Sequence, residues 1–359
     1  MRMPMKVMLA LVVALLATGC SSSTETPRDS SVNDASPPAD TLNRKCYDGC
    51  IEAGKSAEVC KKSCSKPAVD RDGGKTDPCV DGCLKGGKTA GECKTYCTYG
   101  VYQQPHGDAC LPQKQGSYDR CWIEYVPKTV VSKPPLIIDL HGWGATPEFL
   151  RTLSRWPLLA DKEGFVVVWP FGVGKSWNAG AGCCIPASTD NIDDVGFLKA
   201  LIAEMVKSNG VDAKRVYLSG HSNGCAMAQR FANEASDAAA AVACMSHYLL
   251  VGADPEYTPV SVMEVHGNTD TTVGYQAGEQ VGAVANLQKW KTMNGCTGSP
   301  VVTSIQGKSS VQTYGSCKGG TEVSLVTLDE VGHYPYCCKA ITIDTTKMAW
   351  DFMRRFSRP

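Results

Sequence analysis

A serine between two glycines, Gly220-x-Ser222-x-Gly224, is the clearest chemical signal in this 359-residue sequence. It follows an apolar run at 216–218 that is typical of a buried strand, and it precedes a segment with helical patterning. A serine on such a sharp turn takes strained backbone angles, and bulky side chains two residues away would clash. The glycines remove those clashes, so the spacing predicts an accessible, nucleophilic Ser222 hydroxyl. With 35 glycines in the chain, an ordinary Gly-rich turn is the alternative.

A serine hydroxyl needs a base, and the base needs an acid that orients it. Of the six histidines, His333 follows the last predicted strand on a Gly-containing loop, and we expect it to be the general base. Asp270 follows an earlier apolar strand and is the predicted orienting acid. Two other aspartates are less suitable as the acid: Asp254 lies on an earlier polar loop, and Asp329 is too near His333 in sequence. His247 is interpreted as a packed surface histidine.

Stabilising negative charge on a reacting oxygen requires two backbone N–H donors. The first predicted donor of this oxyanion hole is Asn223, directly after the serine. The second is Trp143, within an H-G-x-G loop at 141–144 that follows another strand. A Gly-rich turn without this role is the alternative for that loop. We expect His221, inside the serine turn, to point away from the serine.

Alternating strands and helices must position these side chains. The apolar runs that we expect to form strands are 120–126, 136–140, 165–169, 215–219, 240–245, 261–265 and 322–328. The segments that we expect to form helices are 192–208, 223–235, 278–293 and 345–356. Apolar strands separated by helices predict an α/β fold with a mostly parallel sheet covered on both faces. Ligand sites in such sheets lie at the carboxyl ends of the strands, where the candidate residues fall.

A resemblance to a known family is carried by six motifs in this order: LIIDLHGWGA, WPFGVGKSWNAGAGCC, DNIDDVGFLKALI, VYLSGHSNGCAMAQRFA, VMEVHGNTDTTV and DEVGHYPY. From about residue 110 to the end, the chain resembles the polyhydroxybutyrate depolymerase and feruloyl esterase-like group of secreted α/β-hydrolases. The resemblance implies the α/β-hydrolase fold. The sequence order Ser222, Asp270, His333 is that of the catalytic triad in this fold.

The resemblance also implies that a loop with Trp177 and Asn178 borders the site, so these are the predicted substrate-binding residues. An aromatic side chain there would stack on a flat acyl group such as a cinnamoyl ring, although packing alone explains Trp177 nearly as well. Together with Trp143, it favours a feruloyl-type ester over a hydroxybutyrate ester. Asp193 and Asp194 are interpreted as the N-terminal pair of a helix, stabilised by its dipole.

The N-terminus has the features of an export signal over residues 1–20, with a charged start, an apolar core and the ending Ala-Thr-Gly-Cys. Cys20 resembles the lipidated cysteine of bacterial lipoproteins, so we expect a lipid anchor; a plain secretory signal is the alternative. Residues 21–45 are rich in Ser, Thr, Pro and Asp, which predicts a disordered tether.

A C-x3-C-x9-C-x3-C unit occurs twice, at 46–64 and 79–97. Cysteines four residues apart lie on one face of a helix, so each unit predicts a helical hairpin stapled by disulfides, similar to an α-hairpinin. The expected bridges are Cys46–Cys64, Cys50–Cys60, Cys79–Cys97 and Cys83–Cys93. A zinc site is the disfavoured alternative.

The main domain, predicted at 110–359, holds the remaining cysteines. Cys296–Cys317 and Cys110–Cys121 are the most local pairs that we expect. The cysteines whose pairing stays open are Cys183, Cys184, Cys225, Cys244, Cys337 and Cys338.

Composition sets the outer bounds: 43% apolar and 20% charged residues are ordinary for a globular protein, and zero net charge gives no case for nucleic acid as a partner. We therefore expect an exported serine esterase, lipid-anchored to a bacterial membrane or cell surface or otherwise secreted. It would act through an acyl-enzyme, without metal or cofactor, on polysaccharide-linked or short hydroxyalkanoate esters. The hairpins are candidates for binding a surface or polymer. The alternative is a non-catalytic polymer-binding protein on a hydrolase scaffold.

Overall fold

The computed structural model describes residues 109–276, 278, 281–336 and 343–359. The predicted signal peptide, Cys20, the tether, both cysteine hairpins with their four bridges, and Cys337 and Cys338 lie outside the described residues. Among the described residues, no helix is both long enough and apolar enough to cross a bilayer.

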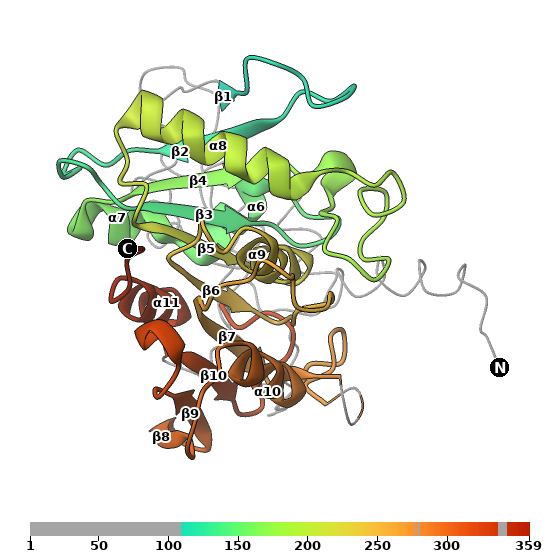
Figure 1. The fold of residues 1–359 in the computed structure, drawn as a ribbon, viewed down its shortest axis with the longest axis vertical. Helices are drawn as coiled ribbons and strands as arrows, with labels where there is room; N and C mark the ends of the chain where they lie inside the picture. Colours follow the sequence, from blue (N-terminus) through green and yellow to red (C-terminus); the bar gives the residue numbers. More distant parts are fainter. Residues whose placement is uncertain (1–108, 277, 279–280, 337–342) are drawn as a thin grey trace, which may run out of the picture. The chain divides into compact units, whose positions relative to one another are not determined.

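A mixed sheet forms the centre of the fold (Figure 1). Its strands are β1 (Ala109–Cys110), β2 (Cys121–Tyr125), β3 (Leu136–Leu140), β4 (Val166–Pro170), β5 (Val216–Gly220), β6 (Ala241–Met245), β7 (Ser261–Gly267), β8 (Val301–Gln306), β9 (Ser309–Tyr314) and β10 (Val323–Leu328). They lie in the order β1-β2-β4-β3-β5-β6-β7-β10-β9-β8. The strands from β4 to β10 in this order are parallel, and the outer strands at both edges pair antiparallel.

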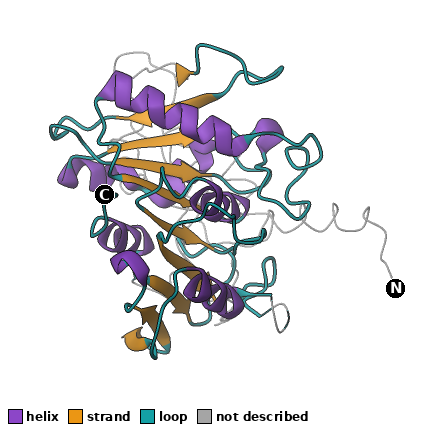
Figure 2. Ribbon diagram, in the orientation of Figure 1, coloured by secondary structure: helices purple, strands orange, loops and turns teal. Residues whose placement is uncertain are grey.

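Helices cover both faces of the sheet (Figure 2). The α-helices are α6 (Pro147–Ser154), α7 (Trp156–Glu163), α8 (Asp194–Asn209), α9 (Asn223–Glu234), α10 (Ala283–Met293) and α11 (Thr345–Met353). Two short 3-10 turns are η1 (Val173–Lys175) and η2 (Lys318–Gly320). Side chains of α8, α9 and α10 join one apolar cluster, and those of α6, α7 and α11 join the other. The parallel strands are thus buried on both faces, as their continuous apolar runs predict.

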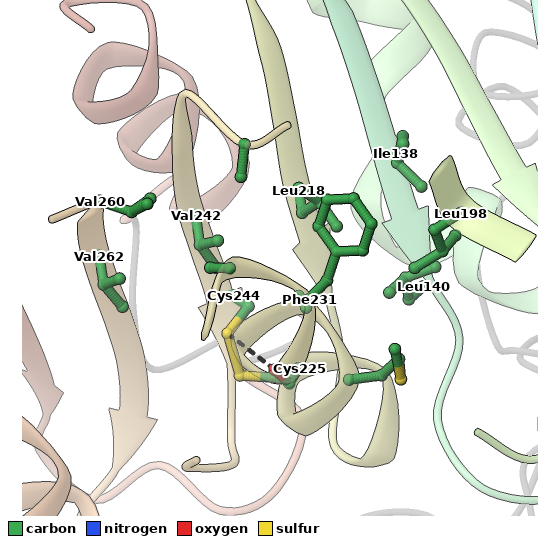
Figure 3. Close-up of a cluster of buried hydrophobic side chains, with 14 of the residues drawn as sticks. Ile138, Leu140, Leu198, Leu218, Cys225, Phe231, Val242, Cys244, Val260 and Val262 are labelled. Atoms are coloured by element: carbon green, nitrogen blue, oxygen red, sulfur yellow. Dashed lines mark hydrogen bonds between the residues drawn. A yellow bond between two sulfur atoms is a disulfide. The ribbon is translucent and has the colours of Figure 1, made fainter. Parts of the chain in front are cut away.

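The core beneath α9 connects the central strands to the helix that follows Ser222 (Figure 3). Phe231 of α9 packs with Leu218 of β5 and Val242 of β6 in this cluster. A disulfide between Cys225 and Cys244 crosses the same layer. Helix α9 is therefore fixed to the sheet by a covalent bond near its start and by apolar packing near its end.

The predicted fold class is confirmed, and the seven predicted strands and four predicted helices are present with small shifts at their ends. Helix α10 begins at Ala283 rather than 278, after Gly282 with φ 133°. Helices α6 and α7 were not predicted; they are two eight-residue helices separated by Arg155 in a left-handed conformation. Strands β8 and β9 were not predicted either, because β8 is an exposed edge strand without regular alternation of apolar and polar residues.

Candidate active site

Ser222 lies on the turn between β5 and α9, with φ 53° and ψ −124°. This backbone conformation is rare for a residue with a side chain, and it marks a strained turn. A Cβ on Gly224 would lie 1.9 Å from the carbonyl oxygen of Leu140, and one on Gly220 would lie 2.7 Å from the carbonyl carbon of Gly224. Both glycines are therefore required by close backbone approach, as the motif predicts.

The loop after β3 packs directly on this serine. A Cβ on Gly142 would lie 3.4 Å from Cβ of Ser222 and 3.3 Å from Nδ1 of His221. His141 braces the loop: its Nε2 accepts the N–H of Gly172 at 3.0 Å, so its Nδ1 carries the hydrogen and donates to the Gly142 carbonyl at 2.9 Å. Burial lowers the pKa of His141 to about 4, which keeps the ring neutral near pH 7.

Two backbone amides are placed beside Ser222. The N–H of Asn223 belongs to the first turn of α9, where amides have no acceptor within the helix. The Gly142 carbonyl faces His141, and in a trans peptide the N–H of Trp143 points the opposite way. The assignment of Asn223 and Trp143 as oxyanion donors stays a prediction that this geometry supports.

Asp270 and His333 lie on the loops after β7 and β10, two neighbouring parallel strands. Oδ2 of Asp270 is 2.7 Å from Nδ1 of His333. Burial raises the pKa of Asp270, but hydrogen bonds from His266 and His333 outweigh it and hold that pKa below its ordinary value. The predicted acid and base are therefore joined, with the acid ionised at neutral pH.

The loop of His333 also contacts the serine turn. Nε2 of His221 donates to the backbone carbonyl of His333 at 2.7 Å, and the two rings lie 4.8 Å apart between centroids. His221 is adjacent to Ser222, so the structure brings the three predicted triad residues to the same edge of the sheet. The ring of Tyr334 also stacks on that of His221, with the two centroids 4.7 Å apart.

His247 is buried, at 8% exposure, so its interpretation as a surface histidine was wrong. Its Nδ1 accepts the N–H of Tyr248 at 2.9 Å. Burial, then the charge of His333, lowers the pKa of His247 to about 4. His247 lies two residues after the end of β6. Because β6 is central and covered on both faces, the residues that follow it are buried as well.

The substrate-binding roles predicted for Trp177 and Asn178 do not fit the structure, because both side chains are buried, at 0% and 6% exposure. Trp177 exchanges hydrogen bonds with Asn223: its N–H donates to Oδ1 at 2.8 Å and its carbonyl accepts from Nδ2 at 3.0 Å. The N–H of Asn178 donates to Asp194 at 2.7 Å. Trp177 therefore holds the loop against α9 and Asn178 holds it against α8, and neither side chain faces a substrate.

Asp193 and Asp194 have separate structural roles. Asp193 caps α8 by accepting the N–H of Gly196 at 2.8 Å, as an N-terminal acid should. Asp194 instead forms a buried ion pair with Arg120 at 2.6 Å. Both acids therefore lie at the N-terminus of α8, as predicted, and Asp194 also ties the start of this helix to Arg120, the residue before β2.

Exposed apolar side chains surround the serine turn. Trp143, Ile185 and Tyr334 are 42%, 42% and 37% exposed. The indole N–H of Trp143 donates to the carbonyl of Ile185 at 2.7 Å, which fixes the ring over the loop that follows β4. Within the described ranges, no group of three His, Cys, Asp or Glu side chains is suited to holding a metal ion.

Four disulfides lie in the described part of the chain. The predicted pairs Cys110–Cys121 and Cys296–Cys317 are confirmed. Two further pairs, which the sequence left open, flank the site: Cys225–Cys244 and the vicinal pair Cys183–Cys184. The amide nitrogen of the Asn223 side chain lies 3.5 Å from Sγ of Cys183. Cross-links therefore support both sides of the serine turn.

Comparison with known proteins finds esterases. Residues 121–292 match the family model described as Esterase PHB depolymerase. Feruloyl esterase B of Piromyces equi is 30% identical over 244 residues, covering 63% of this chain and 42% of that protein. The bifunctional acetylxylan esterase/xylanase XynS20E of Neocallimastix patriciarum is 29% identical over 240 residues, covering 65% of this chain and 33% of that protein. The chain thus spans less than half the length of these curated relatives.

Among solved structures, the acetyl xylan esterase from Aspergillus awamori aligns with a TM-score of 0.54 at 15% identity, covering 68% of this chain and 100% of that chain. At this identity, the match bears on the fold alone.

Proposed function

We propose that this chain, a polyhydroxybutyrate depolymerase- and feruloyl esterase-like α/β-hydrolase, is a serine esterase that cleaves carboxylic esters through an acyl-enzyme. The observation that carries the proposal is the convergence of three loops on one strained turn. Ser222 has φ 53°, Gly142 packs against it, and the hydrogen-bonded pair of His333 and Asp270 contacts the residue next to it. This arrangement supplies a nucleophile, a base and an orienting acid.

The proposed reaction begins when the hydroxyl of Ser222 attacks the ester carbonyl and His333 takes its proton. Asp270 orients the imidazole and stabilises the imidazolium that forms. The backbone N–H groups of Trp143 and Asn223 receive the negative charge on the carbonyl oxygen. His333 then gives the proton to the leaving alcohol, and a water molecule activated by the same histidine hydrolyses the acyl-enzyme.

Hydrolysis of p-nitrophenyl acetate tests this mechanism. Asp270→Asn should lower kcat by about 10⁴-fold, because the base would be held in the wrong tautomer. Asp329→Asn is the matched control, since Asp329 lies on the loop of His333 but bonds to Asn268 instead. Near-normal turnover in Asp270→Asn, or an equal loss in Asp329→Asn, would contradict the proposed roles.

Feruloyl esters are the substrates that we propose first, with acetyl-xylan and hydroxybutyrate esters as the other candidates. Curated relatives are named feruloyl esterase and acetylxylan esterase. The exposed Trp143 and Tyr334 offer aromatic faces near Ser222, whereas the buried Trp177 does not. Aromatic pairing contributes about 0.5–1.5 kcal/mol beyond area burial.

Side-by-side kinetics on the three ester classes tests the substrate. Trp143→Ala keeps the backbone N–H, so it should lower kcat/KM for methyl ferulate by about 2- to 10-fold. Its effect on p-nitrophenyl acetate should be smaller, because a methyl group makes no stacking contact. A higher kcat/KM for the hydroxybutyrate ester, unaltered in Trp143→Ala, would favour a depolymerase. Binding of insoluble polymer without hydrolysis of any ester would favour the non-catalytic alternative.

We further propose that the protein is exported and anchored by a lipid on Cys20, which its sequence context supports. Stable attachment then depends on acyl chains, since residues 21–45 offer little apolar surface. Cys20→Ser should move the protein from the membrane fraction to the soluble fraction. Unchanged membrane fractionation would contradict the anchor. Binding of a surface or polymer by the hairpins at 46–64 and 79–97 is a separate proposal that deletion of both units tests.

A further inference from the structure

The carboxylate of Asp270 is surrounded by four nitrogen atoms. Its Oδ1 accepts the backbone N–H groups of Thr272 at 2.8 Å and Val273 at 2.9 Å. Its Oδ2 lies 2.7 Å from Nδ1 of His333 and 3.3 Å from Nε2 of His266. Two imidazole rings therefore share a single carboxylate oxygen.

His266 is fully buried, and both of its ring nitrogens face oxygen atoms. Nδ1 lies 2.6 Å from Oε1 of Glu264, and Nε2 lies 2.8 Å from the carbonyl oxygen of Val273. Glu264 and His266 are two residues apart on β7, so their side chains share one face of the sheet. The second carboxylate oxygen of Glu264 accepts from the side-chain amide of Asn286 at 2.6 Å.

These acceptors determine where the protons of His266 lie. The Val273 carbonyl and the ionised Asp270 have no hydrogen to give, so Nε2 must carry one. Oε2 of Glu264 accepts from Asn286, and an ionised Glu264 makes Nδ1 a donor as well. A doubly protonated His266 ring carries a positive charge that balances the negative charge of one of its two carboxylate neighbours, Glu264 and Asp270. Without it, two negative charges would lie together in the interior, at a high cost in free energy.

The direction of the pKa shift agrees with this placement. Burial lowers the pKa of His266, but hydrogen bonds to Asp270 and Glu264 outweigh burial and raise it from 6.5 to about 10. The ring therefore keeps its charge across the neutral range, in contrast to the buried His141, His221 and His247.

We propose that His266 is a positioning residue that remains an imidazolium at neutral pH, is anchored by Glu264, and holds Asp270 ionised and oriented toward His333. The proposal rests on the proposed catalytic roles of Asp270 and His333. The positive charge of His266 offsets part of the negative charge of Asp270. The general base then faces a carboxylate whose charge is partly compensated.

Other titratable groups around this cluster are uncharged at neutral pH. Burial lowers the pKa of His221 to about 3 and that of His247 to about 4. Burial raises the pKa values of Tyr248 and Tyr275 above 10.0, and the ring of Tyr275 lies 5.8 Å from that of His266. Among the described residues, the charges closest to the imidazolium are therefore those of the two carboxylates and, when it is protonated, of the general base.

Nitrogen NMR of the histidine side chains in the whole protein measures this charge directly. We expect one histidine to be an imidazolium at about pH 8. Its signal should vanish in His266→Gln and persist in His247→Gln, the matched buried control. Glu264→Gln retains the ring but removes its anchor, so the midpoint of this signal should fall by about one pH unit or more. A wild-type spectrum with every histidine neutral at that pH, or a midpoint unchanged in Glu264→Gln, would overturn the proposal.

The pH profile of ester hydrolysis adds a readout that a merely structural role would not move. Without the charge of His266, the negative charge of Asp270 is uncompensated beside the reacting centre. The acid limb of kcat/KM in His266→Gln should therefore move to higher pH by about one unit, while that of His247→Gln should stay in place. Lower rates with an unmoved limb would contradict the positioning role. If the wild type hydrolyses no ester, the proposed function fails, but the NMR result still decides the charge of His266.

Discussion

Two tryptophans lie on the loops that border Ser222, and their surroundings differ. Trp143 is 42% exposed, whereas Trp177 is 0% exposed and lies 5.1 Å from the ring of His141 between centroids. The indole N–H of Trp177 donates to the His141 carbonyl at 2.9 Å. Trp177 therefore links the loop after β4 to the loop that carries the predicted oxyanion donor Trp143.

Replacing Trp177 should thus affect folding more than selectivity among esters. Trp177→Ala should lower the free energy of unfolding by about 3–5 kcal/mol, because a large buried side chain is lost. Urea unfolding followed by circular dichroism measures this. The exposed Trp143→Ala should change stability by less than about 1 kcal/mol. Wild-type stability in Trp177→Ala, with an altered preference between acyl groups, would restore its role in substrate binding.

The sequence was sufficient to predict the residues whose spacing or order along the chain is distinctive. Ser222 lies in a local motif, and Asp270 and His333 each follow an apolar strand. Glu264 and His266 were missed because their strand reads as a buried apolar run. The signal that could have found them is a charged residue and a histidine two apart in such a run, since both must then lie on one face and satisfy each other.

At the scale of elements, the site depends on how closely β3 approaches the start of α9. The carbonyl of Leu140 accepts the N–H of His221 at 3.0 Å, and Gly224 lies against the same carbonyl. The disulfide Cys225–Cys244 ties the next residue of α9 to β6. The turn that carries Ser222 is therefore held by β3 and β6, the strands on either side of β5, as well as by its own sequence.

Gly224→Ala tests this close approach. Its Cβ would lie 1.9 Å from the Leu140 oxygen, so backbone must move and unfolding free energy should fall by about 3 kcal/mol or more. Turnover should fall with it, because the shift displaces Ser222. Gly252→Ala is the control, since a Cβ there meets nothing within 4 Å. Thermal unfolding that is equal in the two variants would show that the turn does not need this contact.

Uniform burial made the central strands predictable from the sequence. Strands β3 to β7 are covered on both faces and read as continuous apolar runs. Strand β8 could not be predicted in this way, because Val301 and Val302 are 69% and 64% exposed and their neighbours are polar. Pairing with β9 defines this strand, and such pairing leaves no periodic signal in the sequence.

For the molecule as a whole, one buried carboxyl couples stability to pH. Asp139 on β3 is fully buried, and its Oδ2 accepts from the indole of Trp169 at 3.0 Å. Its Oδ1 has no hydrogen-bond partner among the described residues. Burial raises the pKa of Asp139 from 3.8 to about 7, and the hydrogen bond from Trp169 offsets only part of this effect.

Because this pKa is raised on folding, the folded state binds a proton more tightly than the unfolded chain does. The contribution to stability is complete below about pH 4 and is lost as pH rises to about 7. Asp139→Asn should therefore be more stable than wild type at about pH 8, and this advantage should shrink toward pH 4. Melting temperatures across this range measure it, with the exposed Asp119→Asn as control. A constant difference across pH would contradict the shift.

Covalent labelling with a fluorophosphonate, followed by peptide mass spectrometry, tests directly whether Ser222 is the nucleophile of an esterase. We expect one adduct, on Ser222, and a parallel loss of p-nitrophenyl acetate hydrolysis as labelling proceeds. Ser222→Ala should fold normally, take no label and hydrolyse no ester. Hydrolysis that persists in Ser222→Ala, or an adduct on a different serine that abolishes activity, would contradict the account.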